Sequence, residues 1–308
     1  MHSISGGSPA GPRRRHGATG AREGASAGGR FDYTTVGHVT VDVTDGGSRR
    51  PGGTAFYSAL QASRLGLRTL ILTRGAPREI EQLLAPYRAE LEFVVQPAEQ
   101  TTTLQTSGSG AERSQRVLAW AGPIEAASLD TGILHLAPVA RETPPRWHGE
   151  VQFVGLTPQG LVRDWPREGG EISLAPATSD AFPARCDAIV ISEVERDSCA
   201  ELLSRAGRAD TVVAVTAGAR PTTILVPGSA SLQVPAAAAE DPGGDDLGAG
   251  DVFAAAFFIA LREGRPVRQA AGFAGAAAAL RVGAAGTSGI ADRSAIESRA
   301  AAAKQSPA

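Results

Sequence analysis

The chain has 308 residues, of which 42% are hydrophobic and 20% charged, enough for a large core in one α/β domain or two smaller ones. The formal charge of −2 creates no global field that would favour nucleic acid or an anionic membrane. Two cysteines suggest neither a disulfide framework nor a zinc site. No apolar run reaches the roughly 18 residues of a membrane span. We therefore expect a cytoplasmic metabolic protein whose partner is a small molecule.

Both ends of the chain differ in composition from the middle. Residues 1–30 are rich in Gly, Ser, Ala and Arg without periodic apolar residues, which predicts a disordered tail. Residues 298–308 are expected to fray, and residues 31–297 contain no linker that would divide them into two domains. The only lysine is Lys304. This excludes a P-loop, which requires Gly-Lys-Ser/Thr.

From residue 31 onward the pattern predicts alternating strands and helices. The expected strands are residues 33–43, 68–73, 92–97, 132–138, 150–156, 186–192 and 211–216. The expected helices in this part are residues 52–66, 77–91 and 193–207. Such alternation is typical of parallel strands joined by right-handed helical crossovers.

One segment interrupts this alternation. Residues 101–122 hold two polar runs of high β-propensity joined by the flexible sequence SGSGAE, which predicts a β-hairpin. A hairpin inserted into an α/β domain can serve as a lid over a binding site, and a purely decorative insertion is an equal alternative.

Residues 245–261, DDLGAGDVFAAAFFIAL, place acidic residues and glycines before an apolar helix. The helix is expected to begin between Gly248 and Asp251 and to bury one face. Amides in a first helical turn have no intrahelical partner and carry partial positive charge. The small residues Gly248, Ala249 and Gly250 would let an anion approach those amides. Asp251 would point its carboxylate to the same place.

An aspartate at a helix start is most often a cap or a partner of the helix dipole. In a large sheet protein without a P-loop lysine, an anion site beside a candidate base nevertheless suggests phosphoryl transfer from a nucleotide to an alcohol.

Two stretches resemble the signatures of the ribokinase-like, PfkB-type carbohydrate kinases. Residues 245–261 are similar to the C-terminal signature, usually Asp-Thr-x-Gly-Ala-Gly-Asp, and residues 52–75, GGTAFYSALQASRLGLRTLILTRG, to the N-terminal one. With VGHVTVD (36–42) and residues 272–290, the likeness covers nearly all of residues 31–297. It implies a three-layer α/β/α fold with a central, mostly parallel sheet and a small β-hairpin lid.

The resemblance also implies roles for residues at matching positions. Asp251 matches the catalytic general base, and the amides of Ala249 and Gly250, with Gly248 shaping the turn, match the anion hole for the transferred phosphoryl group. The implied substrate-binding residues are Asp42, Gly52, Gly53, Tyr57, Gln159 and Arg163. The implied cofactor-binding residues are Ser192, Glu195, Thr216, Gly218, Asp245 and Gly275. Glu195 would in addition organise Mg²⁺ through water molecules.

Some positions depart from the family pattern. Leu247 stands where threonine is usual, Ser192 replaces the asparagine of Asn-x-x-Glu, Pro221 replaces a second glycine, and Gly275 replaces a polar residue. Tyr57 stands where ribokinases carry a substrate-binding asparagine, which disfavours ribose. The pattern of residues 101–105, 113–118, 122–124, 134–138 and 154–165 resembles the subgroup containing inositol kinases and some nucleoside kinases. Gln159 and Arg163 belong to the last of these stretches. For both of them, a core or surface role is an equal alternative to substrate binding.

Three hypotheses follow. The first is an ATP-dependent kinase for a sugar, polyol or cyclitol such as inositol, with ATP and Mg²⁺ as cofactors and a monovalent cation left open. The second is a nucleoside kinase on the same fold. The third is a non-catalytic nucleotide- or sugar-binding homologue. By family analogy, a homodimer through the lid is a further expectation.

Overall fold

The computed structural model describes most of the predicted domain. The described residues are 30–44, 46–108, 114–166, 169–239, 245–284 and 286–305. The predicted disordered tail, except Arg30, and the tip of the predicted hairpin, residues 109–113, lie outside them.

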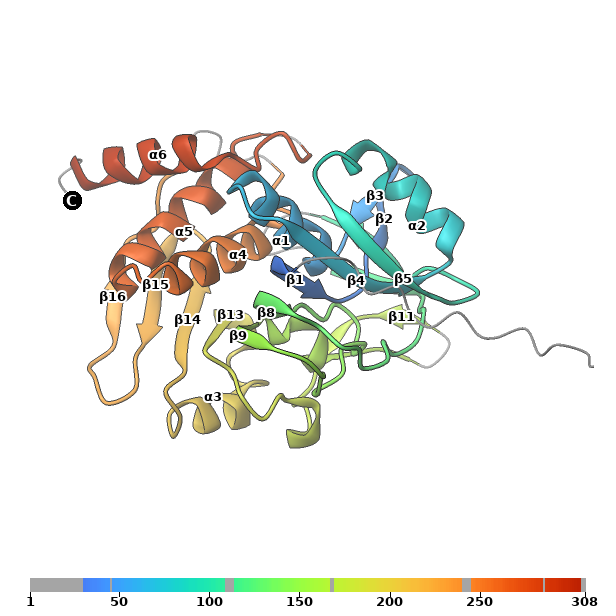
Figure 1. Cartoon of the computed structure of the whole chain (residues 1–308), viewed down its shortest axis with the longest axis horizontal. Helices are drawn as coiled ribbons and strands as arrows, with labels where there is room; N and C mark the ends of the chain where they lie inside the picture. The colour runs from blue at the N-terminus through green and yellow to red at the C-terminus, as the bar shows by residue number, and fades with distance from the viewer. Residues whose placement is uncertain are drawn as a thin grey trace, which may run out of the picture.

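A nine-stranded sheet forms the centre of the molecule (Figure 1). Its strands are β1 (Phe31–Val36), β4 (Thr69–Gly75), β5 (Glu92–Pro97), β8 (Thr131–Leu136), β9 (Val151–Leu156), β13 (Ala188–Ser192), β14 (Val212–Ala217), β15 (Arg220–Leu225) and β16 (Leu232–Val234). Their spatial order is β16-β15-β14-β13-β9-β8-β1-β4-β5. The strands from β14 to β5 are parallel, and β15 and β16 add antiparallel pairs at one edge.

Helices cover both faces of this sheet, as Figure 1 shows. The helices are α1 (Thr54–Arg64), α2 (Pro77–Leu84), α3 (Ala200–Ala206), α4 (Ala249–Arg262), α5 (Val267–Val282) and α6 (Arg293–Gln305). Helices α1, α4 and α5 share one apolar core, and α3 packs in the core of the other face. The predicted three-layer α/β/α architecture is therefore confirmed. The tail expected to fray from residue 298 is instead helical as far as Gln305, because α6 packs on α5 through Ile296.

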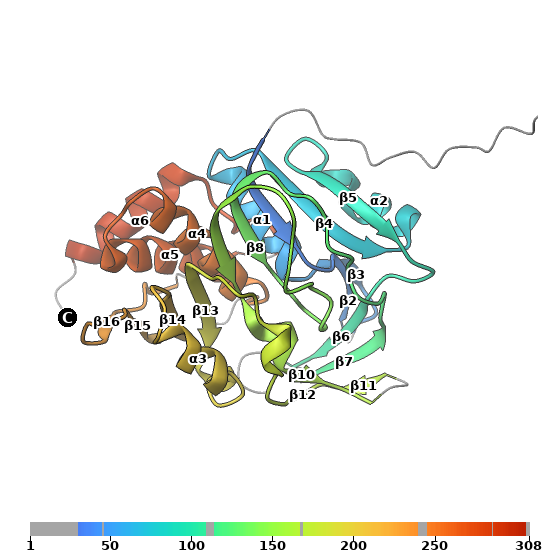
Figure 2. The same ribbon diagram turned by 60° about the horizontal axis from the view of Figure 1, so that its bottom comes forward.

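A second sheet has five strands and lies beside the carboxyl ends of β1 and β8 (Figure 2). Its strands are β2 (Thr40–Thr44), β3 (Arg49–Gly52), β6 (Thr103–Ser107), β7 (Ser114–Ala119) and β11 (Gly170–Glu171). The predicted hairpin is present as the antiparallel pair β6–β7. It is part of a larger layer, because β6 also pairs with β2. A separate short ladder joins β10 (Arg163–Asp164) to β12 (Ser173–Leu174).

The single strand expected over residues 33–43 is wrong, because the chain changes sheets at Gly37. A Cβ at this position would lie 2.1 Å from the carbonyl oxygen of Ala137, so only glycine lets the end of β1 approach the loop after β8. The chain then turns, and β2 begins at Thr40 in the second sheet. Alternating apolar residues continue across the turn, which is why the sequence pattern concealed it.

The helix expected over residues 193–207 is also shorter than predicted. Glu195 accepts a hydrogen bond from the Ser192 amide (2.9 Å), which closes the 3₁₀ turn η5 (Glu193–Glu195). The regular helix α3 begins only at Ala200.

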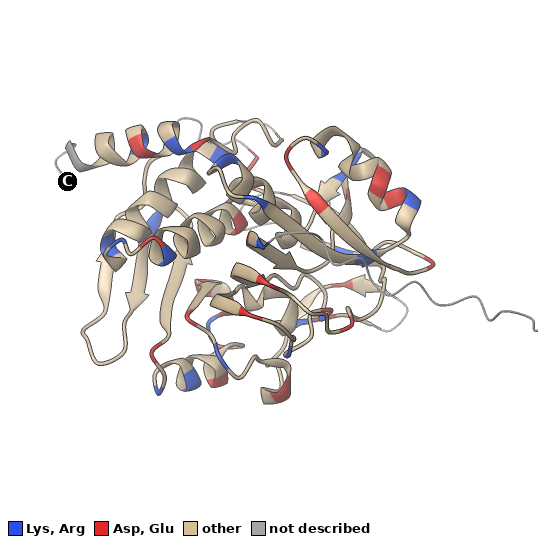
Figure 3. Ribbon diagram, viewed as in Figure 1, with Lys and Arg blue, Asp and Glu red and all other residues tan. Residues whose placement is uncertain are grey.

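Acidic and basic residues are interspersed over the described elements (Figure 3), as the small net charge predicts. No helix among the described residues is long and apolar enough to cross a membrane.

Candidate active site

Helix α4 begins at a tight backbone turn beside an aromatic ring. Gly248 adopts a left-handed conformation (φ 83°), and a Cβ there would lie 2.6 Å from the ring of Tyr57. Both facts require glycine at this position. By contrast, a Cβ at Gly250 would have no heavy atom within 4 Å. The backbone at Gly250 therefore faces open space, as an approaching anion would require.

The amides of the predicted anion hole are not equivalent. The Ala249 amide donates to the carbonyl of Asp246 (3.1 Å), and the Val252 amide donates to the carbonyl of Gly248 (2.9 Å). The amides of Gly250 and Asp251 donate to no group among the described residues. The two donors free to bind an anion are therefore those of Gly250 and Asp251, one residue later than the sequence predicts.

Asp251 combines a first-turn position with a perturbed carboxyl group. Burial raises its pKa to about 6, while a hydrogen bond from Thr54 and the charge of Arg163 act in the opposite direction. The negative charges of Glu195 and Asp42 raise the pKa further. A half-buried carboxylate with a pKa near 6 is ionised at neutral pH and is a stronger base than an ordinary aspartate. Three predicted site residues, from three segments, thus act on one carboxyl group.

Asp42 lies in β2, directly above the glycine pair that precedes α1. A Cβ at Gly52 would lie 2.0 Å from Oδ2 of Asp42, and a Cβ at Gly53 would lie 2.3 Å from the carbonyl oxygen of His38. The Thr40 hydroxyl donates to Oδ1 of Asp42 (2.7 Å). Burial raises the pKa of Asp42, and the hydrogen bond from Thr40 opposes this effect. The carboxylate is therefore fixed in orientation over bare backbone.

The turn before α4 is built around Asp245. Its Oδ2 accepts from Nη1 of Arg50 (2.9 Å) and Nη2 of Arg281 (3.3 Å), and its Oδ1 accepts from the Leu247 amide (3.1 Å). Burial would raise the pKa of Asp245, but the Leu247 amide and the two guanidinium groups lower it more. Asp245 was predicted to bind a cofactor. That role stays a prediction, and in the structure the carboxylate is bonded by these protein groups.

Most of the residues predicted to bind the cofactor lie at or just after the carboxyl ends of β13 and β14. Ser192 and Thr216 are direct neighbours in the register of these parallel strands. Gly218 has a left-handed conformation (φ 63°) with open space around its α-carbon. Gly275 lies on α5, where an added Cβ would be 3.9 Å from the Ala237 amide. No contact among the described residues joins Gly218 or Gly275 to Asp251.

The two residues taken from the stretch 154–165 differ in their surroundings. Arg163 is buried, and it donates from Nη1 to the Val139 carbonyl (2.9 Å) and from Nη2 to Gln115 (2.7 Å). Burial lowers its pKa, and the charges of Glu195 and Asp251 act against this. Gln159 is half-buried in the 3₁₀ turn η3 (Pro158–Val162) and makes no hydrogen bond within the described part of the chain. Arg163 is therefore part of the electrostatic environment of Asp251, whereas Gln159 has no such link.

A buried carboxylate that the sequence did not reveal organises the loop after β8. Glu142 accepts hydrogen bonds from the amides of His38 (2.8 Å), Val139 (2.8 Å) and Ala140 (2.6 Å). It thereby ties the turn between β1 and β2 to the neighbouring loop. Nothing in its local sequence, PVARET, distinguishes it from a surface acid.

The described residues hold no group of three or more His, Cys, Asp or Glu side chains that could bind a metal ion. The Glu195 side chain uses Oε2 to accept from the Ser192 amide and makes no other hydrogen bond to described residues. One carboxylate oxygen is thus left to hold water around a divalent ion. This fits Mg²⁺, which binds through few carboxylates and keeps several waters.

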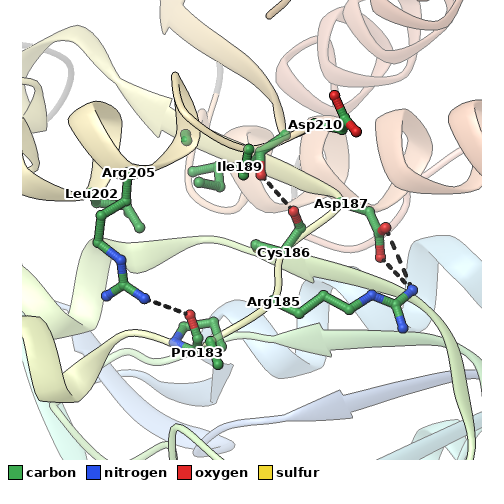
Figure 4. A pocket seen from close by; sticks show the side chains of 12 residues that line it. Pro183, Arg185, Cys186, Asp187, Ile189, Leu202, Arg205 and Asp210 are labelled. Atoms are coloured by element: carbon green, nitrogen blue, oxygen red, sulfur yellow. Dashed lines mark hydrogen bonds and ion pairs between the residues drawn. The ribbon is translucent and has the colours of Figure 1, made fainter.

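A separate cavity of about 290 Å³ lies at the opposite edge of the sheet (Figure 4). Cys186, Asp187 and Arg205 line it, at the amino ends of β13 and β14. It therefore does not belong to the candidate active site.

Comparison with known proteins gives a family match over part of the chain and structural matches over most of it. Residues 173–293 match the pfkB family carbohydrate kinase. No curated protein sequence matches the chain. A pyrophosphate-dependent kinase in the ribokinase family, solved with a pyrophosphate analog and myo-inositol, shares the fold with a TM-score of 0.67 and 20% identity, covering 86% of this chain and 99% of that one.

Two further solved structures are similar to the same extent. The Arabidopsis thaliana ribokinase complexed with ribose and ATP has a TM-score of 0.65 and 18% identity, covering 88% of this chain and 99% of its own. The Methanocaldococcus jannaschii nucleoside kinase has a TM-score of 0.67 and 18% identity, covering 89% of this chain and all of its own. PfkB carbohydrate kinases are phosphotransferases with hydroxyl acceptors. This chain therefore has the ribokinase fold, and its residues 173–293 match the pfkB family carbohydrate kinase.

Proposed function

We propose that this protein transfers the terminal phosphoryl group of ATP to a hydroxyl of a small polyhydroxylated molecule, a sugar, polyol or cyclitol. The observation that carries the proposal is the start of α4. Two unpartnered amides, of Gly250 and Asp251, open into free space beside a carboxyl group whose pKa is raised to about 6. The amides would stabilise the charge on the moving phosphoryl group. Asp251 would accept the proton of the attacking hydroxyl.

Asp42 supplies the acceptor side of this proposal. Asp42 is buried. Its carboxylate accepts a hydrogen bond from the Thr40 hydroxyl and lies against the backbone of Gly52. An oriented carboxylate that faces a ligand accepts hydrogen bonds from two neighbouring hydroxyls, which are what a polyol or cyclitol offers. The Tyr57 ring closes the same region, because it packs against Gly248. A flat aromatic wall suits the apolar face of a sugar or cyclitol ring.

The donor side rests on the residues at the ends of β13 and β14. Glu195 would hold the waters of Mg²⁺, and the metal would supply charge neutralisation on the donor phosphates when bound. The described residues near the site carry no lysine, so this chain's fixed positive charge comes from arginines such as Arg163. One structural neighbour is a pyrophosphate-dependent kinase, so pyrophosphate is tested as a second donor.

The experiment is a matrix of donors and acceptors with the purified protein. ATP and pyrophosphate are each combined with inositols, hexoses, pentitols and nucleosides, and release of ADP or of phosphate is measured. Turnover with a cyclitol, sugar or polyol supports the proposal, and turnover restricted to nucleosides selects the nucleoside kinase instead. If no pair is turned over while ATP still binds in calorimetry, the protein is a non-catalytic homologue and the proposal is wrong.

The homodimer through the second sheet stays a prediction. Cytoplasmic location likewise stays a prediction from composition.

A further inference from the structure

Arg281 is a fully buried arginine whose role the family pattern does not explain. It lies in the last turn of α5, inside the apolar run GFAGAAAALRVG, and its side chain is 0% exposed. A charged side chain is almost never this deeply buried unless other groups compensate its charge. The compensating groups should therefore show what Arg281 does.

Four oxygen atoms from the α4 turn and the end of α5 surround the guanidinium group. Nη1 donates to the carbonyls of Asp245 (2.9 Å) and Ala284 (3.1 Å). Nη2 donates to the Leu247 carbonyl (2.5 Å) and to Oδ2 of Asp245 (3.3 Å). Three backbone carbonyls and one carboxylate oxygen thus converge on one positive charge.

Such a set of oxygen atoms is also the kind that binds a monovalent metal ion, since hard cations take carbonyl and carboxylate ligands. The sequence leaves open whether a monovalent cation is a cofactor of this protein. The structure does not fit one here, because the guanidinium of Arg281 already uses these oxygens. The guanidinium of Arg50 also shares Oδ2 of Asp245, so a further positive charge among these oxygens would be repelled.

We propose that the guanidinium of Arg281 takes the place of a bound monovalent cation. It fixes the turn at residues 245–248 and thereby positions the amides of the anion hole. The protein therefore needs no bound monovalent cation. This proposal rests on the function proposed above. Arg281 touches no expected position of substrate or donor, so it is a positioning residue.

A chain of contacts links Arg281 to the free amides. Arg281 holds the carbonyls of Asp245 and Leu247, and Leu247 immediately precedes Gly248, whose left-handed conformation sets the direction of α4. The Tyr57 ring contacts both: the guanidinium carbon lies 5.7 Å from the ring centre, and a Cβ added at Gly248 would lie 2.6 Å from the ring. Without the guanidinium, three carbonyl dipoles and a carboxylate would face one another, and the turn would be expected to shift.

The main test is Arg281→Ala with added cations. The variant should lose about 10²- to 10³-fold in kcat, the effect of a displaced anion-hole donor, with a smaller change in the KM of the acceptor. Guanidinium or potassium ions should enter the vacated space and raise the kcat of the variant about tenfold, as one recovered hydrogen bond to a charged group would. Tetramethylammonium, which cannot approach the carbonyls, should restore nothing. The wild-type protein should work equally well in potassium, sodium and tetramethylammonium salts.

Two other variants serve as controls. Arg281→Met fills the space without charge, so it should lose the same activity and gain nothing from any cation. Arg205→Ala removes an arginine that also binds two backbone carbonyls, those of Ser179 and Pro183, but at the cavity on the far edge of the sheet (Figure 4). It should keep the wild-type rate in every salt.

A readout independent of activity separates this proposal from the proposed function. The midpoint of thermal unfolding of Arg281→Ala should rise with guanidinium at low concentration or with potassium, and not with tetramethylammonium, because a bound cation stabilises the folded state. If the wild-type protein turns over no donor–acceptor pair, the kinase proposal is refuted. The shift in the unfolding midpoint then remains as the test of Arg281. The inference is wrong if the wild type requires potassium, if Arg281→Ala keeps the wild-type rate, or if no small cation affects that variant.

Discussion

Replacing Asp251 by asparagine should raise the stability of the protein while it abolishes turnover. Burial raises the pKa of Asp251 from 3.8 to about 6, so ionisation of this carboxyl group costs free energy in the folded state and costs nothing comparable in the unfolded chain. Asparagine has nearly the same shape and stays neutral at every pH. The variant therefore avoids a cost that the wild type carries because an activated base is needed at that place.

The size and sign of the effect follow from the two pKa values. Their difference corresponds to about 3 kcal/mol of unfolding free energy, and solvent screening of this half-buried group makes that an upper limit. The folded-state pKa is the higher one, so the folded state binds the extra proton. The penalty is absent below pH 3.8, grows between pH 3.8 and about 6, and is fully present above about 6. Asp251→Asn should thus be more stable than the wild type at pH 8, by about a third as much near pH 4.5, and hardly at all near pH 3.

Urea unfolding followed by circular dichroism at several pH values measures this difference, and the donor–acceptor assay measures the rate. The rate should fall about 10²- to 10⁴-fold, the usual contribution of a general base. Asp210→Asn, an exposed acid beside the cavity on the far edge of the sheet, is the matched control and should change neither quantity. A variant that retains the wild-type rate, or whose stability gain does not depend on pH, would refute the role assigned to Asp251.

Three further outcomes are expected. Because the base must be unprotonated, kcat/KM should decline about tenfold per pH unit below about 6, and a profile flat to pH 5 would argue against it. Gly52→Ala should greatly reduce activity, since its Cβ would overlap the Asp42 carboxylate at 2.0 Å; Gly46→Ala, with open space around it, should not. Glu142→Gln should cost about 1 to 3 kcal/mol in urea unfolding by leaving buried amides unpaired.

The sequence was most informative where one local pattern sufficed. The apolar periodicity after Gly250 predicts a buried helix, and the start at Ala249 agrees with this within a residue. The parallel strands were predictable because buried β-branched runs alternated with helical patterns. The two glycines at 52 and 53 were predicted to lie against a ligand, and the structure gives a second reason for them, since each is approached closely by Asp42 or the His38 carbonyl.

Long-range contacts set the features that the sequence could not give. The change of sheet at Gly37 depends on a carbonyl 100 residues away in the chain, that of Ala137, and no local pattern encodes such an approach. Arg281 stands alone in an apolar run, a signal that marks it as unusual without revealing that its partners are Asp245 and Leu247.

The sequence by itself determined the alternation of the parallel strands with helices and the helix start that carries Asp251, because hydrophobic periodicity and glycine act over a few residues. The tertiary structure alone decided the chemical state of the site. The raised pKa of Asp251 comes from burial together with charges that the fold brings from distant segments, Arg163, Glu195 and Asp42. Electrostatic interactions depend on distance in space, and that distance exists only once the chain has folded.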